Sequence, residues 1–311
     1  MLYSIFAVLG GLVALFFGGE LLVRGAVGLS EKFGLPPLVT GIVVVGAATS
    51  MPEMVASIEA ARQGSPEIAW GNVIGSNIAN SLLILGATAV IAPIVLHGVG
   101  KRDALVGLAA AGALWLATAM QIGSSWLGAG FLAALVLYII WRIKHLPDTK
   151  SVDDVENAIA DNPVWWLAIV QFLAGLAVLI GGGQFLVSGA INLAQMAGIS
   201  ETVIGLTVVA IGTSLPELAA SAAAAWRGHS ELAIGNVVGS NLYNLLLIGG
   251  VTMVIAPNPV PAELLAIQWP VLAAATMLVL LLCWFAKRIG RGLGVVLLAG
   301  FAANTALVFA L

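Results

Sequence analysis

Long apolar segments follow one another along nearly the whole chain. Apolar runs of roughly 20 residues recur between short polar breaks, and a run of that length is enough to cross a bilayer as a helix. The runs are continuous and do not alternate with polar residues, which argues against a porin-like barrel. The sequence therefore predicts an all-α polytopic membrane protein. We place ten spans at 4–28, 36–61, 67–92, 103–121, 125–144, 164–196, 201–225, 231–256, 262–286 and 291–311.

Composition excludes several classes of protein. Only 9% of the residues are charged and the mean hydropathy is +1.07, whereas soluble domains have about 25% charged residues. A soluble enzyme, a nucleic-acid binder and a disordered chain are therefore excluded. The single cysteine, Cys283, excludes a disulfide framework, and the three histidines are too far apart in sequence to indicate a His/Cys metal site. The first residues, MLYSIFAVLGG, lack a basic region and are interpreted as the first span.

The chain also repeats itself. When it is shifted by 164 residues it aligns with itself without a gap, roughly from Gly11 to Pro93 and from Gly175 to Pro257. The longest matching segment is identical at 11 of 16 positions. The two halves are therefore copies of one structural unit. The matching segments are GGELLVRG (18–25) with GGQFLVSG (182–189), GAATSMPE (46–53) with AIGTSLPE (210–217), and GNVIGSNIANSLLILG (71–86) with GNVVGSNLYNLLLIGG (235–250).

Each repeat holds five spans, which is an odd number. The second repeat therefore enters the membrane from the opposite side, so the two form an inverted repeat whose equivalent elements meet near the bilayer midplane. We divide the chain into a first repeat at 1–144, a linker at 145–163 and a second repeat at 164–311. The linker carries five of the fifteen acidic residues.

Basic residues are distributed very unevenly between the two sides of the predicted membrane. With the N-terminus outside, eleven of the twelve Lys and Arg residues fall on the inner side, and only Arg62 falls outside. The eleven include Lys32 in the first inner loop and Arg24 within the inner end of the first span. Cytoplasmic loops are enriched in Lys and Arg. We therefore expect a multi-pass protein of the plasma or inner membrane, with both termini outside and the acidic linker in the cytoplasm.

A proline followed by a glutamate occupies the same position in both repeats, inside an apolar helical run. Pro52 and Pro216 cannot donate to the carbonyls of Ala48 and Gly212, so we expect broken helices at the midplane. Irregular backbone at membrane depth is tolerated only against protein or a hydrated cavity. The glutamates that follow, Glu53 and Glu217, then begin half-helices, whose N-terminal dipole favours negative charge.

Further polar residues repeat in the next span. Ser76 and Asn80 are four residues apart, as are Ser240 and Asn244, so each pair lies on one helical face. The inverted units can build one pocket of carboxylates, hydroxyls, amides and freed carbonyls, without sulfur or imidazole. Hard cations such as Ca²⁺ and Na⁺ prefer such a set. Two bidentate glutamates and two carbonyls supply six oxygens, within the roughly 6–8 that Ca²⁺ takes.

The paired ATSMPE and GTSLPE segments and the paired GNV(I/V)GSN segments resemble the Na⁺/Ca²⁺ exchangers of the cation/Ca²⁺ antiporter superfamily, in their prokaryotic ten-span form. The resemblance covers almost the whole chain. It implies that Glu53 and Glu217 bind Ca²⁺ and share Na⁺ sites, and that the first and sixth spans are gating helices. By resemblance, the other ion ligands are the hydroxyls of Thr49, Ser50, Ser76, Thr213, Ser214 and Ser240, the backbone carbonyls of Gly46 and Ala210, and the site-lining Asn80 and Asn244.

The sequence departs from many members of that family at two positions. Asn244 stands where many members carry an aspartate, which leaves two formal charges in the centre and puts K⁺ co-transport in doubt. Ala48 replaces a glycine that is usual in the first motif. We expect exchange of Na⁺ for Ca²⁺ by alternating access, with the lipid bilayer and inorganic cations as partners. Neither a cofactor, nor nucleic acid, nor an obligatory protein partner is expected.

Three alternatives stay open. A Ca²⁺/H⁺ antiporter would use the same two glutamates as proton carriers, although the hydroxyl-rich motifs favour Na⁺. A cation channel would conduct far faster than a carrier, and the inverted repeat argues against it. An intramembrane enzyme would need a base or a metal beside Ser50 or Ser214, and no histidine lies at membrane depth.

Other repeated or intramembrane polar residues have simpler interpretations. Glu20 and Glu59 do not repeat, so helix-end or gating roles are favoured over ligation. Glu67 and Glu231 do repeat, but each lies in the first turn of a span, where the helix dipole explains an acid. Interhelical hydrogen bonding and ion lining explain equally well the repeated asparagines Asn72, Asn77, Asn236 and Asn241. The glycines spaced as GxxxG indicate close helix packing: Gly71 with Gly75, and Gly235 with Gly239.

Overall fold

The computed structural model of the chain is almost entirely helical in the part that it describes. The acidic linker, apart from His145, and the first part of the span predicted at 201–225 lie outside that part. The described residues are 2–62, 66–96, 98–145, 165–197, 210–258, 260 and 266–309.

The helices of the first half agree with the predicted spans to within a few residues. The second predicted span is a series of short segments with a bend of 44° between Pro37–Thr49 and Met51–Arg62. The elements are α1 (Leu2–Phe33), α2 (Pro37–Thr40), the π-helical η1 (Gly41–Val45), α3 (Gly46–Thr49), α4 (Met51–Arg62), α5 (Pro66–Ala79), the π-helical η2 (Asn80–Ile84), α6 (Leu85–Ile91), β1 (Ile94–Val95), α7 (Lys101–Ala119) and α8 (Ser125–Lys144).

The second half contains the same succession of helices. Three of them, α12, α13 and α15, begin and end 164 residues after their equivalents α3, α4 and α6. The sequence repeat is thus also a repeat of secondary structure. The elements are α10 (Trp165–Met196), α12 (Ala210–Thr213), α13 (Leu215–Trp226), α14 (Ser230–Leu242), the π-helical η4 (Tyr243–Ile248), α15 (Gly249–Ile255), α16 (Gln268–Phe285), β2 (Arg288–Ile289) and α17 (Arg291–Phe309).

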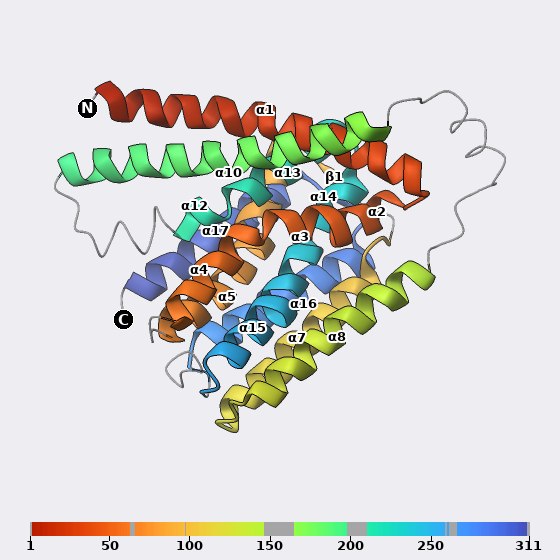
Figure 1. Cartoon of the computed structure of the whole chain (residues 1–311), viewed down its shortest axis with the longest axis vertical. Coiled ribbons are helices and arrows are strands. Elements are labelled where there is room, and N and C mark those ends of the chain that lie inside the picture. The colour runs from red at the N-terminus through yellow and green to blue at the C-terminus, as the bar shows by residue number, and fades with distance from the viewer. Residues whose placement is uncertain are drawn as a thin grey trace.

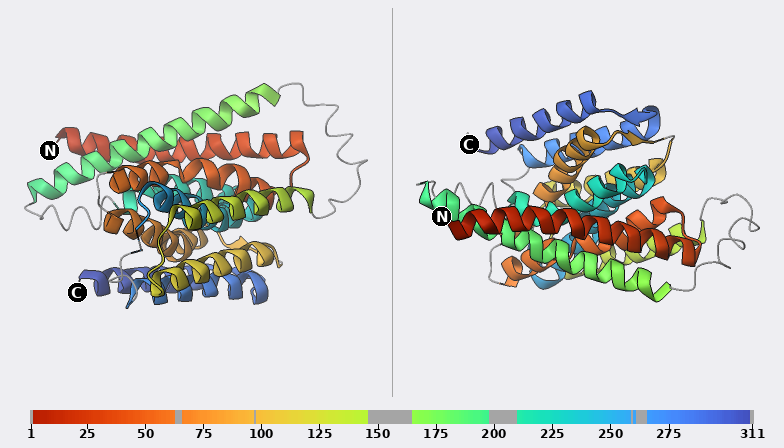
Figure 2. Two further views of the ribbon diagram at one scale, coloured as in Figure 1. Left: turned by 60° about the horizontal axis from the view of Figure 1, so that its bottom comes forward. Right: turned by 90° about the horizontal axis from the view of Figure 1, so that it is seen from above.

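The long helices α1 and α10 lie side by side and antiparallel along one edge of the molecule (Figure 1). The broken helices and α14 lie in the interior, and α17 covers the side opposite to α1 and α10 (Figure 2). Between 67% and 78% of the most apolar window of the α5–α6 and α14–α15 spans is buried, against 33% for α1 and 11% for α17. The α5–α6 and α14–α15 spans, one from each repeat, therefore form the core, and the remaining helices surround it.

Glycines bring α1 and α10 into close contact. A Cβ at Gly25 would lie 2.3 Å from the backbone N of Phe172, and a Cβ at Gly175 would lie 2.3 Å from that of Leu22. Small residues let membrane helices approach to backbone contact. The glycines of this seam repeat every seven residues and are equivalent between the repeats: Gly11, Gly18 and Gly25 on α1, and Gly175, Gly182 and Gly189 on α10.

The predicted GxxxG packing is seen in the second repeat. A Cβ at Gly235 would lie 2.5 Å from the carbonyl oxygen of Leu38, and one at Gly239 would lie 2.7 Å from the Cα of Ile42. These glycines therefore press α14 against α2 and η1 of the first repeat. The equivalent Gly71 and Gly75 have no described neighbour within 4 Å of such a Cβ.

Eight described helices are long and apolar enough to cross a membrane, and the bent pair of α2–α3 with α4 makes nine. The predicted count of ten is compatible with this number, because the equivalent bent segment of the second half starts among residues outside the described ranges. The first helix begins and the last helix ends at the same end of the molecule, whereas α8 ends and α10 begins at the other end (Figures 1 and 2).

A short antiparallel pair of strands joins the two halves at one end. Ile94 pairs with Ile289, and Val95 pairs with Arg288, so the connection before α7 is held against the connection before α17. Both connections carry basic residues that the charge distribution assigns to the inner side. One detail of that prediction was wrong: α1 continues to Phe33 and does not end at residue 28, so Lys32 lies on the helix and not in a loop. The reason is that no Gly or Pro interrupts the helix between Gly28 and Gly34, which has a φ of +60°. Arg24 lies on the helix, within the predicted span.

Candidate functional site

The two broken helices are interrupted at equivalent serines. The segment α3 ends at Thr49 and α4 begins at Met51, with Ser50 between them. In the second half α12 ends at Thr213 and α13 begins at Leu215, with Ser214 between them. The prolines lie in the first turn of the next helix, where a missing N–H is tolerated. The interruption predicted from Pro52 and Pro216 is therefore present, two residues before each proline.

The two glutamates are buried and face serines of the opposite repeat. Glu53 and Glu217 are each 1% exposed and each lies in the first turn of its half-helix. The hydroxyl of Ser50 donates to Glu217 Oε1 at 3.4 Å, and the hydroxyl of Ser214 donates to Glu53 Oε1 at 3.3 Å. Because the bonds cross between repeats, they bring both broken segments and both carboxylates into one cluster.

Several oxygen atoms of this region are buried without a hydrogen-bond partner in the part of the chain that is described. Buried polar atoms in proteins are nearly always hydrogen-bonded, so this gathering is a candidate set of ligands for a cation. Neither glutamate belongs to any ion pair among the described residues, where Asp103 pairs with Arg142 and Glu20 with two arginines. The unpartnered oxygens are Glu53 Oε2, Glu217 Oε2, Asn80 Oδ1, Asn244 Oδ1 and Ser240 Oγ.

The other predicted ligands lie around the same breaks. Thr49, Ser76 and Ser240 are buried, and a Cβ at Gly46 would lie 3.0 Å from the backbone N of Ser240. The carbonyl of Gly46 accepts the backbone N–H of Ser50 at 3.2 Å. Ala210 begins α12, at the position equivalent to Gly46. Asn80 and Asn244 lie in the π-helical segments η2 and η4, a geometry that is frequent at functional sites.

Two asparagines that the sequence left undecided hold the half-helices in place. Asn72 Nδ2 donates to the backbone carbonyl of Glu53 at 3.0 Å and to Ser57 Oγ at 2.9 Å. Asn236 Nδ2 donates equivalently to Glu217 at 3.2 Å and to Ser221 Oγ at 2.9 Å. Interhelical hydrogen bonding is therefore what these side chains do.

The serines in these contacts were not singled out from the sequence. Ser57 and Ser221 are each four residues after a glutamate and are equivalent in the two repeats. That repetition at helical spacing is the signal that would have found them.

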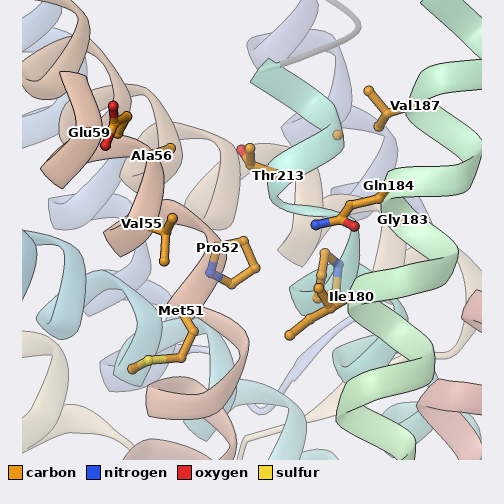
Figure 3. A pocket seen from close by; sticks show the side chains of 12 residues that line it. Met51, Pro52, Val55, Ala56, Glu59, Ile180, Gly183, Gln184, Val187 and Thr213 are labelled. Carbon is orange, nitrogen blue, oxygen red and sulfur yellow. The ribbon is translucent and has the colours of Figure 1, made fainter. Parts of the chain in front are cut away.

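A cavity of about 510 Å³ reaches the broken segments from the side of α10. Both prolines of the breaks and Thr213 line it, with Gln184 directed toward them from α10 (Figure 3). Glu59 also lies on the wall of the cavity, on α4 about one and a half turns beyond Glu53. The lining residues are Met51, Pro52, Val55, Ala56, Glu59, Ile180, Gly183, Gln184, Val187, Gly212, Thr213 and Pro216.

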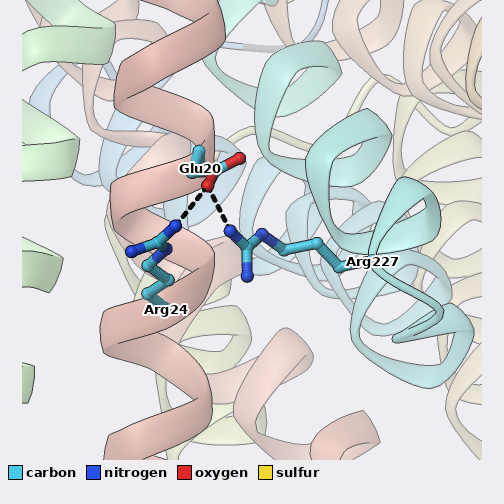
Figure 4. Close-up of polar contacts among 3 residues, drawn as sticks. All are labelled: Glu20, Arg24 and Arg227. Atoms are coloured by element: carbon cyan, nitrogen blue, oxygen red, sulfur yellow. Dashed lines mark hydrogen bonds and ion pairs between the residues drawn. The ribbon is translucent and has the colours of Figure 1, made fainter.

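Glu20 lies outside this cluster and ties α1 to the second repeat. It forms an ion pair with Arg24 on α1 at 2.6 Å and another with Arg227 at the end of α13 (Figure 4). One residue before it, a Cβ at Gly19 would lie 2.8 Å from the carbonyl oxygen of Ala219 on α13. The helix-end interpretation of Glu20 was wrong, because α1 continues to Phe33 and Glu20 lies in its interior. The gating role stays a prediction.

Comparison with known proteins gives a consistent result. The model of the family described as "Sodium/calcium exchanger protein" matches residues 3–144 and 167–310. The chain is 37% identical to the putative antiporter CaxA of Alkalimonas amylolytica, over 99% of both chains. It is 31% identical to the sodium/calcium exchanger MaX1 of Methanosarcina acetivorans, over 96% of both. A solved structure of the sodium-calcium exchanger NCX_Mj, soaked with Na⁺ and Sr²⁺, has a TM-score of 0.85 and 30% identity over 98% of both chains.

Proposed function

The chain belongs to the sodium/calcium exchanger family, and from that premise we propose that it exchanges Na⁺ for Ca²⁺ by alternating access at one shared site built around Glu53 and Glu217. The observation that carries the proposal is the pair of buried, repeat-equivalent carboxylates. Each keeps one oxygen without a partner in the described chain, and each is reached by a serine from the opposite repeat. The charge of such a pair is compensated by one Ca²⁺.

Competition for the same oxygens provides the coupling. Carboxylates, hydroxyls and amide oxygens are ligands for both Ca²⁺ and Na⁺. Ca²⁺ takes both carboxylates, whereas several Na⁺ ions use the carboxylates together with the neutral hydroxyls, so the two cargoes exclude each other. The protein changes between its two states only when the charge of the site is neutralised, because an uncompensated buried charge is costly. Antiport follows, since the protein changes state with either cargo but not empty.

The proposed ligands divide by charge. Glu53 and Glu217 hold Ca²⁺ and take part in binding Na⁺. The remaining groups complete the Na⁺ sites or line the centre: the hydroxyls of Thr49, Ser50, Ser76, Thr213, Ser214 and Ser240, the carbonyls of Gly46 and Ala210, and the amides of Asn80 and Asn244. If three Na⁺ replace one Ca²⁺, each cycle moves one net charge, worth about 2.3 kcal/mol per 100 mV.

The cavity beside α10 supports a route for ions to this site. It connects the two proline breaks with the face of α10 that carries Gln184. We place this route on the outer side of the membrane, with α1 and α10 as the pair of helices that opens and closes it. The protein is a multi-pass membrane protein, and the charge distribution favours the plasma or inner membrane with the linker in the cytoplasm.

The test is ⁴⁵Ca²⁺ uptake into proteoliposomes under separately imposed Na⁺, K⁺ and pH gradients. We expect uptake to be driven by an outward Na⁺ gradient and to respond to the membrane potential. Uptake that follows a pH gradient without Na⁺ would instead identify a Ca²⁺/H⁺ antiporter, and uptake that needs no counter-ion would identify a channel.

The two-glutamate site has its own test in the same assay. Glu53→Gln and Glu217→Gln should each abolish Na⁺-driven Ca²⁺ flux, because one remaining carboxylate does not compensate a divalent ion. Glu31→Gln, on the exposed end of α1, is the matched control and should retain the flux. Flux that survives either of the two site variants would contradict the assignment.

A further inference from the structure

Asn72 and Asn236 have a fixed amide orientation that follows from their partners. A backbone carbonyl can only accept a hydrogen bond. The NH₂ group of Asn72 must therefore face the carbonyl of Glu53, and that of Asn236 must face the carbonyl of Glu217, at 3.0 and 3.2 Å. The amide oxygen of each side chain consequently points the other way.

Each of these oxygens meets a hydroxyl of the proposed site. Ser76 Oγ lies 3.4 Å from Asn72 Oδ1, and Thr49 Oγ1 lies 3.2 Å from Asn236 Oδ1. Because an amide oxygen can only accept, the hydroxyls are the donors. The contact to Thr49 crosses between the repeats, and Thr49, Ser76 and Asn236 are all buried.

The direction of these hydroxyl protons decides whether the hydroxyls can bind a cation. A hydroxyl has one proton and two lone pairs, and a cation is attracted only to the lone pairs. If the proton pointed into the site it would repel the ion. An acceptor on the far side of the hydroxyl holds the proton away and leaves the lone pairs facing the site. Besides Asn236, the Thr49 hydroxyl has the carbonyl of Val45 at 3.1 Å on its own helix and the carboxylate of Glu217 as acceptors. When a cation occupies that carboxylate, Asn236 and Val45 are the acceptors that hold the proton away from the ion.

We propose that Asn72 and Asn236 are positioning residues that orient the hydroxyls of Ser76 and Thr49 as Na⁺ ligands while fixing the first turn of each glutamate-bearing half-helix. The inference rests on the proposed function. It assigns Na⁺ affinity to two side chains that do not touch the ion. It also predicts a difference between the cargoes, because neutral hydroxyls contribute to Na⁺ binding whereas Ca²⁺ is held by the carboxylates.

The experiment compares Asn236→Leu with Ser221→Ala in reconstituted protein. Asn236→Leu removes the acceptor for Thr49 and the clamp on α13 together. Ser221→Ala removes one partner of the clamp, which is bonded at 2.9 Å, and leaves the amide oxygen in place. We expect Asn236→Leu to raise the half-saturating Na⁺ concentration about tenfold, equivalent to one hydrogen bond, with a much smaller change in the KM for Ca²⁺. Ser221→Ala should change neither the half-saturating Na⁺ concentration nor the KM for Ca²⁺.

A double variant separates a positioning role of Asn236 from a general loss of structure. In a Thr49→Val background the Na⁺ effect of Asn236→Leu should be largely lost, because the hydroxyl that it orients is gone. Asn72→Leu, with Ser57→Ala as its control, repeats the test through Ser76 in the other half and serves if the first variant does not fold.

The outcomes are distinguishable. Equal shifts for Na⁺ and Ca²⁺, the same shift in Ser221→Ala, or full additivity in the double variant would overturn the inference while the wild type still exchanges Na⁺ for Ca²⁺. A wild-type Ca²⁺ flux that ignores Na⁺ would overturn the proposed function, and the inference with it.

Discussion

Asn244 sets the charge of the proposed site as much as the two glutamates do. It is 1% exposed, its amide oxygen has no hydrogen-bond partner in the described chain, and it lies in the π-helical segment η4. A neutral amide there adds an oxygen without adding charge. The formal charge of the cluster is therefore −2 and equals the charge of one Ca²⁺ in magnitude.

Replacing Asn244 with aspartate should make transport depend on pH. With a third ionised carboxylate the Ca²⁺-loaded site keeps a net charge of −1, and burial of that charge disfavours the change of state. Protonation of one carboxyl group restores the formal charge of the cluster to −2, so that one Ca²⁺ again neutralises it. Ca²⁺ flux of Asn244→Asp should therefore be low at alkaline pH and recover as the pH falls, whereas Asn244→Ser should show no such recovery. Flux measurements across a pH series, with the pH equal on both sides, check this. Identical pH profiles for the two variants would refute the charge argument.

The positions of Glu53, Glu217 and the serines beside them could be predicted because they occur twice at the same offset. The contacts of Asn72 and Asn236 could not, although both asparagines were noticed as repeated. Whether an amide faces an ion or a neighbouring helix depends on how α5 packs against α4, and α14 against α13. That packing angle is not encoded in the spacing of residues along one helix.

Glycines determine how closely α1 and α10 pack against each other. A Cβ at Gly175 would lie 2.3 Å from the backbone N of Leu22 and 2.9 Å from the carbonyl of Gly18. Backbone atoms cannot give way as a flexible side chain can. The seam therefore holds the backbones of the two helices against each other, and we expect the two helices to move together in the proposed gating movement.

Gly175→Ala should separate α1 from α10 and destabilise the protein by about 1–3 kcal/mol, the usual cost of overpacking. Gly181→Ala, six residues further along the same helix, is the matched control because no described atom lies within 4 Å of the added Cβ. Thermal unfolding of the purified protein in detergent, together with Na⁺-driven flux, checks the pair. Equal melting temperatures for the two variants would show that the seam does not constrain the helices.

The ion pairs of Glu20 should restrain the same helix pair. Glu20 and Arg227 are about one-third exposed, so their bond is weak and weakens further with salt. If α1 slides against α13, Glu20→Gln should raise the flux at low ionic strength by up to about fivefold. Added choline chloride should raise the flux of the wild type toward that of the variant. Arg24→Gln removes only the pair within α1 and should change little. A Glu20→Gln variant that matches the wild type at every ionic strength would exclude the restraint.

Element boundaries were predicted well for a physical reason. A helix in a bilayer must satisfy its own backbone, so each apolar run has to be helical along its whole length. The same rule hides the details inside a run. A π-helical segment such as Asn80–Ile84 also satisfies its backbone, and two-residue strands such as Ile94–Val95 are too short to show a pattern. The pairing of the strands is a contact between the two halves, and like the π-helical segments it appears only in three dimensions.

At the scale of the whole molecule, the arrangement of helix ends fits an inverted repeat. Equivalent helices α1 and α10 run in opposite directions (Figure 1). The first half starts at one end of the molecule and finishes at the other, and the second half returns (Figure 2). Both the opposite directions of α1 and α10 and the positions of the ends of each half follow if each half crosses the membrane an odd number of times. Which end faces the cytoplasm is not fixed by the fold, because an inverted repeat has nearly equivalent ends, and it rests on the basic residues alone.

The orientation can be tested with cysteines placed at the two ends of α8. This helix has 20 residues and is about 30 Å long, enough to cross the hydrocarbon core. Because the chain's single cysteine, Cys283, is buried, Cys283→Ala gives a background without a reactive thiol. With both termini outside, Ile122→Cys should react with a membrane-impermeant maleimide in intact cells, and Lys144→Cys should react only after the membrane is opened. The reverse pattern would invert the proposed topology and place the acidic linker outside, and labelling of both cysteines in intact cells would contradict a spanning α8.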